Sequence, residues 1–174
     1  MPLNRLKEYL DQNHARYKII THSPAYSAQE TARAAHVHGM DLMKAVIARI
    51  DGDCVMLVIP APYRVNIEEL KTTFATERVA LASETDFREL FPNCELGAIP
   101  PFGQMFQMDT YVAPCFGERQ MVVFNAGTHA DLINIEFKDF VRLAGAKPLT
   151  GGYNGPAIIL PRMKEHTGKH FQWH

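Results

Sequence analysis

An apolar hairpin in the first third of the chain constrains the fold more than any other feature. Residues 44–50 and 54–59 are rich in β-branched and other apolar side chains, and Asp51-Gly52 between them is typical of a two-residue turn. Because both runs are almost continuously apolar, we expect both faces of these strands to be buried. The sequence therefore predicts a sheet with this hairpin in its interior.

Helices are expected where apolar or small residues recur at helical spacing behind a capping residue. Ser27 and Glu30 form a capping box, and Ala28, Ala32 and Ala35 then mark one face that is small enough to pack closely against a sheet. Further helices are predicted over the first dozen residues, after Asn66, after Ser83 and around residues 137–141. Further strands are predicted over residues 17–22, 78–82 and 132–135, with residues 106–112 and 120–125 as an antiparallel pair.

The order of these elements predicts an α+β fold with a mixed sheet rather than repeated strand–helix–strand units. With 174 residues, of which 47% are hydrophobic, we expect one compact domain over residues 1–146 and a Gly/Pro/His-containing extension over residues 147–174. Within the extension, only residues 157–160 have an ordered pattern. The glycine-rich phosphate-binding signatures of Rossmann and P-loop enzymes are absent, which argues against a nucleotide-dependent enzyme.

Charge and cysteine usage narrow the class of protein further. The 18 Lys and Arg residues nearly balance 19 Asp and Glu residues, so any contact with nucleic acid has to come from a local patch. Cys54, Cys94 and Cys115 are widely spaced and odd in number, which argues against a disulfide framework and favours the reducing cytoplasm. No apolar run approaches the roughly 20 residues that a membrane span requires, so no membrane partner is expected.

Standard catalytic and metal-binding motifs are missing from the sequence. It contains no G-x-S-x-G, no H-E-x-x-H and no H-x-E paired with P-C-x-x-C. His36, His38, His166, His170 and His174 have no ligand spacing with a Cys, Asp or Glu cluster. We therefore expect no metal and no cofactor, and an enzyme of this sequence would work without a local nucleophile motif.

Lys44 stands at the start of the first hairpin strand, immediately before the apolar sequence Ala-Val-Ile-Ala. An ammonium is costly in such a position unless it reaches an anion or solvent. One interpretation is a lysine at a strand end that extends to water. The other is a cationic anchor for a phosphate or carboxylate at the edge of the sheet.

A stiff loop precedes the second half of the chain, and we call it the Gly97 loop. Its residues are Gly97, Ala98, Ile99, Pro100, Pro101, Phe102 and Gly103. The two prolines fix the backbone, and the glycines at its ends permit unusual dihedral angles or close approach. Such a loop could present the amides of Ala98, Ile99, Phe102 or Gly103 to a ligand carbonyl, as ester hydrolysis requires. The simpler interpretation is a rigid turn between two elements.

Residues 125–129, which we call the His129 loop, end a predicted strand with polar and flexible residues. The loop reads Asn125, Ala126, Gly127, Thr128 and His129. In its neutral form, His129 could orient a water molecule or bind a substrate ammonium or hydroxyl group. The alternative is an ordinary surface histidine.

These segments, taken in order, resemble the YbaK/ProX family of aminoacyl-tRNA deacylases and the editing domain of bacterial prolyl-tRNA synthetases. The resemblance begins with His-Ser-Pro-Ala-Tyr-Ser-Ala-Gln-Glu at residues 22–30, continues through Lys44 and the Gly97 loop, and ends after the His129 loop. It covers about residues 20–146. Its most specific elements are the lysine and the G-x-x-x-P sequence at residues 97–101, about fifty positions later.

The resemblance implies a mixed, partly barrel-like sheet surrounded by helices, and hydrolysis of the ester between an amino acid and the 3′ end of mischarged tRNA. Lys44 would hold the terminal nucleotide or its phosphate, the Gly97 loop would grip the ester carbonyl, and His129 would line the pocket. The implied substrate contacts are Ala98, Ile99, Pro100, Pro101, Phe102, Gly103, Asn125, Gly127 and Thr128. Family members work without a metal or a protein nucleophile.

The implied partners are the 3′ end of a mischarged tRNA and, as a further candidate, an aminoacyl-tRNA synthetase. A small amino acid, alanine first, is the expected substrate, because a small pocket rejects larger side chains sterically. Such an enzyme would contribute to translation fidelity. The competing hypothesis is a non-catalytic module with the same fold that binds RNA ends or a protein.

Overall fold

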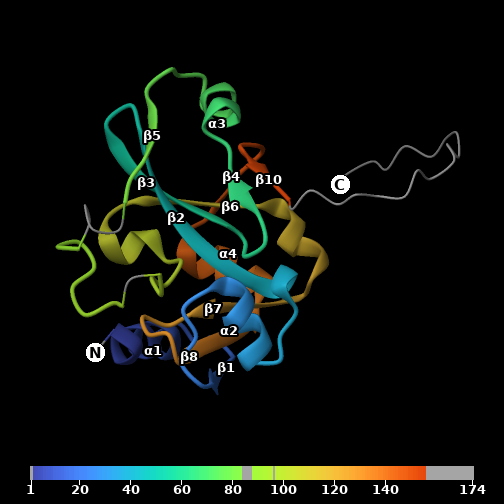
Figure 1. Ribbon diagram of the computed structural model, residues 1–174. Helices are drawn as coiled ribbons and strands as arrows, with labels where there is room; N and C mark the ends of the chain where they lie inside the picture. Colours follow the sequence, from blue (N-terminus) through green and yellow to red (C-terminus); the bar gives the residue numbers. More distant parts are fainter. Residues whose placement is uncertain (1, 84–87, 96, 156–174) are drawn as a thin grey trace, which may run out of the picture.

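The computed structural model describes residues 2–83, 88–95 and 97–155 (Figure 1). It is an α+β structure in which helices surround a mixed sheet, as the sequence predicts. The elements in chain order are α1 (Pro2–Gln12), β1 (Tyr17–Thr21), α2 (Ala28–Ala34), η1 (Gly39–Asp41), β2 (Leu42–Ile50), β3 (Asp53–Pro60), β4 (Arg64–Val65), α3 (Ile67–Thr73), β5 (Val79–Leu81), η3 (Gly103–Phe106), β6 (Asp109–Val112), η4 (Pro114–Glu118), β7 (Met121–Asn125), β8 (Asp131–Glu136), α4 (Phe137–Ala144), β9 (Lys147–Pro148) and β10 (Tyr153–Asn154).

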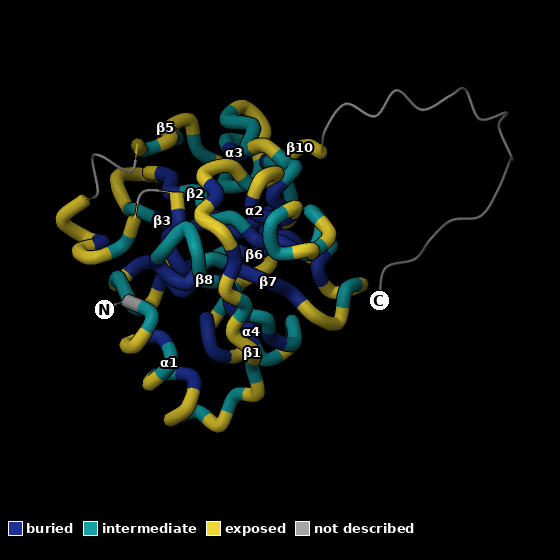
Figure 2. Tube along the Cα trace, turned by 60° about the horizontal axis from the view of Figure 1, so that its bottom comes forward, coloured by how far each residue is buried: buried dark blue, intermediate teal, exposed yellow. Residues whose placement is uncertain are grey.

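The predicted hairpin is the centre of the sheet. Strands β2 and β3 pair antiparallel from Met43 opposite Pro60 to Ile50 opposite Asp53. The turn residues Asp51 and Gly52 have φ angles of 51° and 88°, the left-handed conformations that a tight turn between two strands requires. Most of β3 is fully buried, and Figure 2 shows the buried residues gathered in the strands while exposed residues lie in loops and on outer helix faces. The prediction of an interior hairpin is confirmed.

The main sheet has the strand order β1-β8-β7-β2-β3-β6-β9, with β5 as an additional neighbour of β2. Neighbours β1–β8, β8–β7, β2–β3 and β2–β5 are antiparallel, whereas β7–β2, β3–β6 and β6–β9 are parallel. The remaining short strands β4 and β10 pair with each other. The sheet is therefore mixed, and its central hairpin is flanked by parallel strands on both sides.

One edge of β2 is shared by two different strands. Strand β7 pairs with Leu42 and Met43 at its beginning, and β5 pairs with residues 48–50 at its end. Between them, residues 44–47 have no strand on that edge within the described part of the chain. The strands β2 and β7 thus part immediately before Lys44, and this fork positions the candidate site.

The helices begin where the sequence predicts and cover the sheet with small or apolar residues. The Ser27 side chain accepts a hydrogen bond from the Glu30 amide at 3.1 Å, which caps α2. Ala32 of α2 packs with Leu42, Val123 and other residues of a small hydrophobic cluster. The larger core includes fully buried residues of α1 and α4. None of the described helices has both the length and the apolar character needed to cross a membrane.

The predicted pairing of residues 106–112 with residues 120–125 is wrong. Strand β6 lies between β3 and β9, while β7 lies between β2 and β8. The segment that joins them forms the 3-10 helix η4 with Pro114 in its first turn, so it carries the chain to another part of the sheet instead of reversing it. Strand patterns in the sequence identify the strands but not their partners.

The residues that follow α4 contribute two strands and a buried side chain to the fold, which the sequence does not predict. Strand β9 pairs with β6, β10 pairs with β4, and Leu149 between them is fully buried. Strands of two residues are too short to give an alternating pattern, which explains why they were not predicted. The predicted helix after Ser83 falls partly on residues 84–87, and these, like residues 157–160, lie outside the described residues; residues 88–90 form a turn.

Gly103 provides a test of the packing that fixes the end of the Gly97 loop. Its amide donates to the Thr110 hydroxyl at 2.8 Å, and a β-carbon added at Gly103 would lie 2.7 Å from the Met108 carbonyl oxygen. We expect Gly103→Ala to lower the free energy of unfolding by about 1–3 kcal/mol, because overpacking must move backbone. Chemical denaturation should show this loss, whereas Gly117→Ala, whose β-carbon would have its nearest neighbour at 3.7 Å, should be nearly neutral. Equal stability of the two variants would contradict the packing argument.

Candidate functional site

Lys44 lies at the fork between β2 and β7. The parallel pairs Leu42–Val123 and Met43–Phe124 place Lys44 next in line to Asn125, the last residue of β7. Both side chains therefore project on the face that carries Leu42 and Val123, because alternate residues of a strand share a face. Asn125 Oδ1 is buried and has no hydrogen-bond partner among the described residues. The fork thus brings a cation and an unsatisfied amide oxygen to one place.

The charge of Lys44 lacks an anionic partner in the described structure. The side chain is half-buried, and burial lowers its pKa, as does the nearby positive charge of Arg64. Neither Lys44 nor Arg64 forms an ion pair with any described carboxylate. Two neighbouring cations without a counter-ion attract an anion, and a phosphate or carboxylate fits this arrangement.

The Gly97 loop and the His129 loop lie against each other at Gly97 and His129, the candidate functional residues of the two loops. Gly97 has a φ angle of +85°, and a β-carbon on it would lie 3.2 Å from Cε1 of His129. A side chain at this position would be strained by the backbone conformation and would press against the imidazole. The structure therefore brings together two of the three residues predicted to be catalytic, and glycine is what allows the close approach.

Backbone hydrogen bonds hold the two loops together. The Glu95 amide donates to the Gly127 carbonyl at 2.8 Å, and the Gly127 amide donates to the Ala98 carbonyl at 2.9 Å. In addition, the Glu95 carboxylate accepts the His129 amide at 2.8 Å. Glu95 was not predicted, because a single glutamate before a loop gives no pattern in the sequence. It acts as a clamp that positions His129 beside Gly97.

The remaining residues of the Gly97 loop are buried. Ala98, Ile99 and Phe102 are at most 6% exposed, and Pro100 and Pro101 are also buried. The amides of Ala98, Phe102 and Gly103 donate within the protein, to Glu95, Pro100 and Thr110 respectively. Of the four amides considered for a ligand carbonyl, only that of Ile99 has no hydrogen-bond partner in the described part of the chain. The loop is stiff because its amides are tied both to its own backbone, at Pro100, and to the neighbouring residues Glu95 and Thr110.

The turn after β7 is fixed by Thr128. Its hydroxyl donates to Asp131 Oδ2 at 2.8 Å and accepts from the amides of Ala130 and Asp131. Gly127 adopts a φ angle of +95°, which a residue with a side chain rarely does. Gly127 and Thr128 thus shape the turn that presents His129.

Tyr26 is a further residue at this place, and the sequence does not predict it. Its ring lies 4.9 Å from the His129 ring, centre to centre, with an angle of 52° between the planes. The preceding residue, Ala25, donates its amide to the His129 carbonyl at 3.2 Å. A tyrosine before a helix cap has no distinguishing pattern, so the sequence alone did not single it out.

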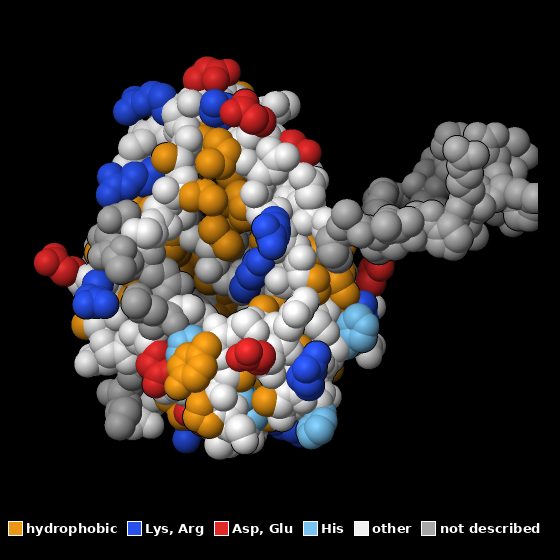
Figure 3. Space-filling view, in the orientation of Figure 1, with side chains coloured by type: hydrophobic (Ala, Val, Ile, Leu, Met, Phe, Trp, Pro, Cys, Tyr) orange, Lys and Arg blue, Asp and Glu red, His pale blue; other side chains and the backbone are white. Residues whose placement is uncertain are grey.

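The surface above these elements is hollowed. In Figure 3, a band of hydrophobic side chains runs down this face, Lys and Arg side chains border it, and a histidine beside a hydrophobic side chain lies below. Comparison with Figure 1 places the hollow in front of β2, between β4 and α2. This setting combines positive charge with apolar walls, which suits an anionic organic ligand.

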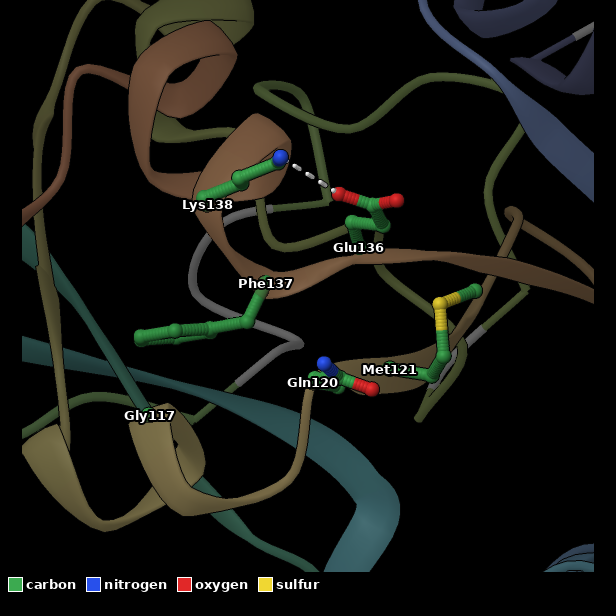
Figure 4. Close-up of a pocket in the computed structure, with 6 residues that line it drawn as sticks. All are labelled: Gly117, Gln120, Met121, Glu136, Phe137 and Lys138. Carbon is green, nitrogen blue, oxygen red and sulfur yellow. Dashed lines mark ion pairs between the residues drawn. The ribbon is translucent and has the colours of Figure 1, made fainter.

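A separate cavity of about 350 Å³ lies at the opposite end of the β7–β8 pair. It is lined by Gly117, Gln120, Met121, Glu136, Phe137 and Lys138. Figure 4 shows Lys138 reaching to Glu136, with which it forms an ion pair at 3.1 Å. None of the predicted site residues lines this cavity. Elsewhere in the described chain, no group of three His, Cys, Asp or Glu side chains is arranged to hold a metal ion.

The chain is similar to proteins of one known family and to several solved structures. The family model described as aminoacyl-tRNA editing domain matches residues 22–143. The crystal structure of hypothetical protein APE2540 has a TM-score of 0.73 at 21% identity, covering 83% of this chain and 96% of that chain. A candidate trans-editing enzyme for prolyl tRNA synthetase has a TM-score of 0.71 at 18% identity, with 84% and 94% covered. No curated protein matches the sequence significantly.

One further structure shows the same fold within a longer chain. A candidate signal transduction protein from Marinobacter aquaeolei VT8 has a TM-score of 0.65 at 13% identity, and the match covers 82% of this chain but 29% of that chain. At such identities, the three structural likenesses show a shared fold.

The clamp formed by Glu95 can be tested by amide hydrogen exchange. Glu95→Ala removes the acceptor for the His129 amide, a hydrogen bond worth about 1 kcal/mol, so this amide should exchange several-fold faster. Glu95→Gln keeps a carbonyl oxygen at the same place and should restore slow exchange. Nuclear magnetic resonance can follow the amides of both loops. Unchanged exchange at His129 in Glu95→Ala would show that the backbone bonds alone hold the loops.

Proposed function

The chain belongs to the aminoacyl-tRNA editing domain family, and from this premise we propose that it hydrolyses the ester bond of mischarged aminoacyl-tRNA in trans. Two observations carry the proposal. Lys44 and Arg64, which form no ion pair with a described carboxylate, stand where β7 ends and the His129 loop begins, and at the other end of that loop the His129 ring lies against the Gly97 backbone. An aminoacyl ester at the end of RNA has a phosphate, a carbonyl and a small side chain that match these features.

Lys44 would bind the phosphate of the terminal nucleotide, with Arg64 as a second positive charge. A half-buried ammonium loses part of its hydration, so a phosphate gains more from it than from a lysine in open solvent. Binding at this point fixes the ribose that carries the ester relative to both loops. Holding the reacting groups in place supplies a large part of the acceleration that such an ester needs.

The Gly97 loop would polarise the ester carbonyl. The Ile99 amide is the donor in the loop that remains available, and a stiff loop holds such a dipole without rearrangement during the reaction. Water, helped by the adjacent ribose hydroxyl of the substrate, would attack the carbonyl carbon, and the tRNA oxygen would leave with a proton. In this scheme, no protein side chain acts as the nucleophile, and the chain needs no cofactor.

The close approach of Gly97 and His129 supports a small amino acid as the substrate. Because Cε1 of His129 would be 3.2 Å from a β-carbon on Gly97, the substrate side chain would lie beside this contact, where the two loops leave little width. A narrow site rejects larger side chains sterically but admits smaller ones. Alanine is our first candidate, and tRNA of a synthetase that mistakes alanine for its own amino acid would be the natural partner.

The alternative is a module of the same fold that binds RNA ends or a protein without catalysis. The occurrence of this fold within a longer signal transduction protein is compatible with such a module. A panel of tRNAs charged with alanine, glycine, serine and larger amino acids separates the two functions. Release of a small amino acid faster than spontaneous hydrolysis supports the enzyme. Binding of tRNA without release supports the module. A protein that neither binds tRNA nor releases an amino acid would contradict both hypotheses.

Replacing Lys44 by Met tests the anchor. Lys44→Met removes the charge but keeps most of the length, so KM for a mischarged tRNA should rise at least tenfold, or about 1.4 kcal/mol. The melting temperature at neutral pH should stay unchanged or rise, because burial and Arg64 disfavour the ammonium in the folded state. Lys138→Met is the matched control, since the Lys138 side chain is 80% exposed in the first turn of α4, away from the fork, and its replacement should leave KM unchanged.

The lowered pKa of Lys44 also predicts a pH dependence of RNA binding. The folded protein loses this proton at a lower pH than the unfolded chain does, so the destabilising effect of the charge disappears as pH rises through the lowered pKa. Affinity for RNA should fall over the same range, because the cation is lost. Titration of binding against pH in wild type and Lys44→Met should show this decline in the wild type alone. The same decline in both proteins would assign it to another group.

A further inference from the structure

Tyr26 presents an aromatic ring to solvent beside the proposed site. It is 76% exposed, whereas the other exposed large hydrophobic residues of the described chain lie between 40% and 44%. An uncovered ring forgoes hydrophobic stabilisation that burial would give. Single exposed aromatic residues are common, so exposure by itself does not identify a site. The way in which Tyr26 is held distinguishes it.

The ring is fixed at its place by contacts on both sides of the backbone. Ala25, which precedes it, is buried and donates its amide to the His129 carbonyl at 3.2 Å. The Tyr26 amide itself donates to the Glu30 carboxylate at 3.3 Å, and the ring rests against His129 at 4.9 Å. Tyr26 is therefore a preorganised flat surface, one side of which is supported by His129 while most of it remains open.

We propose that the open face of Tyr26 stacks against the unpaired terminal base of the RNA whose ester lies beside Gly97 and His129. This inference rests on the proposed function. In an aminoacylated nucleotide, the base and the ester are attached to the same ribose, so the base must lie within one sugar of the reacting carbonyl. The His129 ring lies between the two: the Tyr26 ring is 4.9 Å from it, centre to centre, and a β-carbon on Gly97 would be 3.2 Å from its Cε1.

In this arrangement, positive charge would recognise the phosphate of the nucleotide and aromatic stacking would recognise its base. Lys44 and Arg64 supply the positive charge for a phosphate, and the whole chain has a net charge of −1, so broad electrostatic attraction is weak. Stacking on an aromatic ring does not depend on net charge and suits any base, because every base has a flat π face. A phosphate held at one point and a base held at another also fix the direction in which the ribose faces the loops.

A fluorescent RNA tests the stacking contact without relying on catalysis. The probe is a short RNA hairpin with an unpaired 3′ end whose last base is 2-aminopurine, an adenine analogue that loses fluorescence when stacked; a second RNA lacks this base. Wild type should quench the probe and bind it at least about fivefold more tightly than the RNA without the base. Tyr26→Ala should lose both the quenching and the preference, and Tyr26→Phe should keep both.

Two controls separate stacking from changes in folding or charge. Met121→Ala, at the far end of β7, removes another partly exposed apolar side chain and should keep the full preference for the terminal base. The loss caused by Tyr26→Ala should be equal at low and high salt, because it involves no phosphate, whereas the loss caused by Lys44→Met should shrink as salt rises. An unchanged melting temperature of the Tyr26→Ala variant would show that the ring does not stabilise the fold.

The outcomes distinguish this inference from the proposed function. If wild type deacylates tRNA while Tyr26→Ala keeps the preference for the terminal base, the stacking contact is refuted and the function stands. If Tyr26→Ala binds RNA normally but loses binding to a protein partner, the ring serves that partner and the inference is wrong. If wild type neither binds RNA nor releases an amino acid, both the function and the stacking contact are refuted.

Discussion

The unequal sharing of one edge of β2 is the constraint on which the rest of the site depends. Strand β7 occupies the first two residues of that edge and β5 the last three, so the strands part beside Lys44. Where strands part in this way, side chains and loops replace the regular ladder, and a crevice forms that a ligand can enter. The His129 loop begins where β7 ends at this fork, and backbone hydrogen bonds join it to the Gly97 loop.

The site combines a rigid scaffold with an unfavourable charge. Hydrogen bonds within the protein satisfy most amides of the Gly97 loop, Thr128 shapes the opposing turn, and Glu95 ties the two loops together. Into this frame the fold places a half-buried lysine near an arginine, an arrangement that costs stability in the absence of an anion. Such a cost is consistent with a binding role, because the same desolvation strengthens the attraction for the ligand.

Local sequence signals predicted the elements well, whereas partners between distant strands escaped them. The hairpin around Asp51-Gly52 and the cap at Ser27 depend on neighbouring residues and were predicted correctly. The pairing of β6 with β3 depends on contacts far apart in the chain, and a turn-rich connection suggested a hairpin instead. Within the site, glycine and histidine drew attention through their chemistry, and the structure brings Gly97 and His129 into contact. Glu95 and Tyr26 matter through position, which no pattern in the sequence encodes.

The unpaired cations at the fork also bear on how the protein behaves in solution. Inorganic phosphate and sulfate carry the same acceptor oxygens and negative charge as a phosphodiester, so either ion is a natural occupant of the space near Lys44 and Arg64. An ion that binds the folded chain and not the unfolded chain stabilises the fold by mass action, in proportion to the logarithm of its concentration. The choice of buffer therefore affects the measured stability: phosphate would protect the protein against heat, and it would compete with the proposed RNA phosphate for the same two side chains.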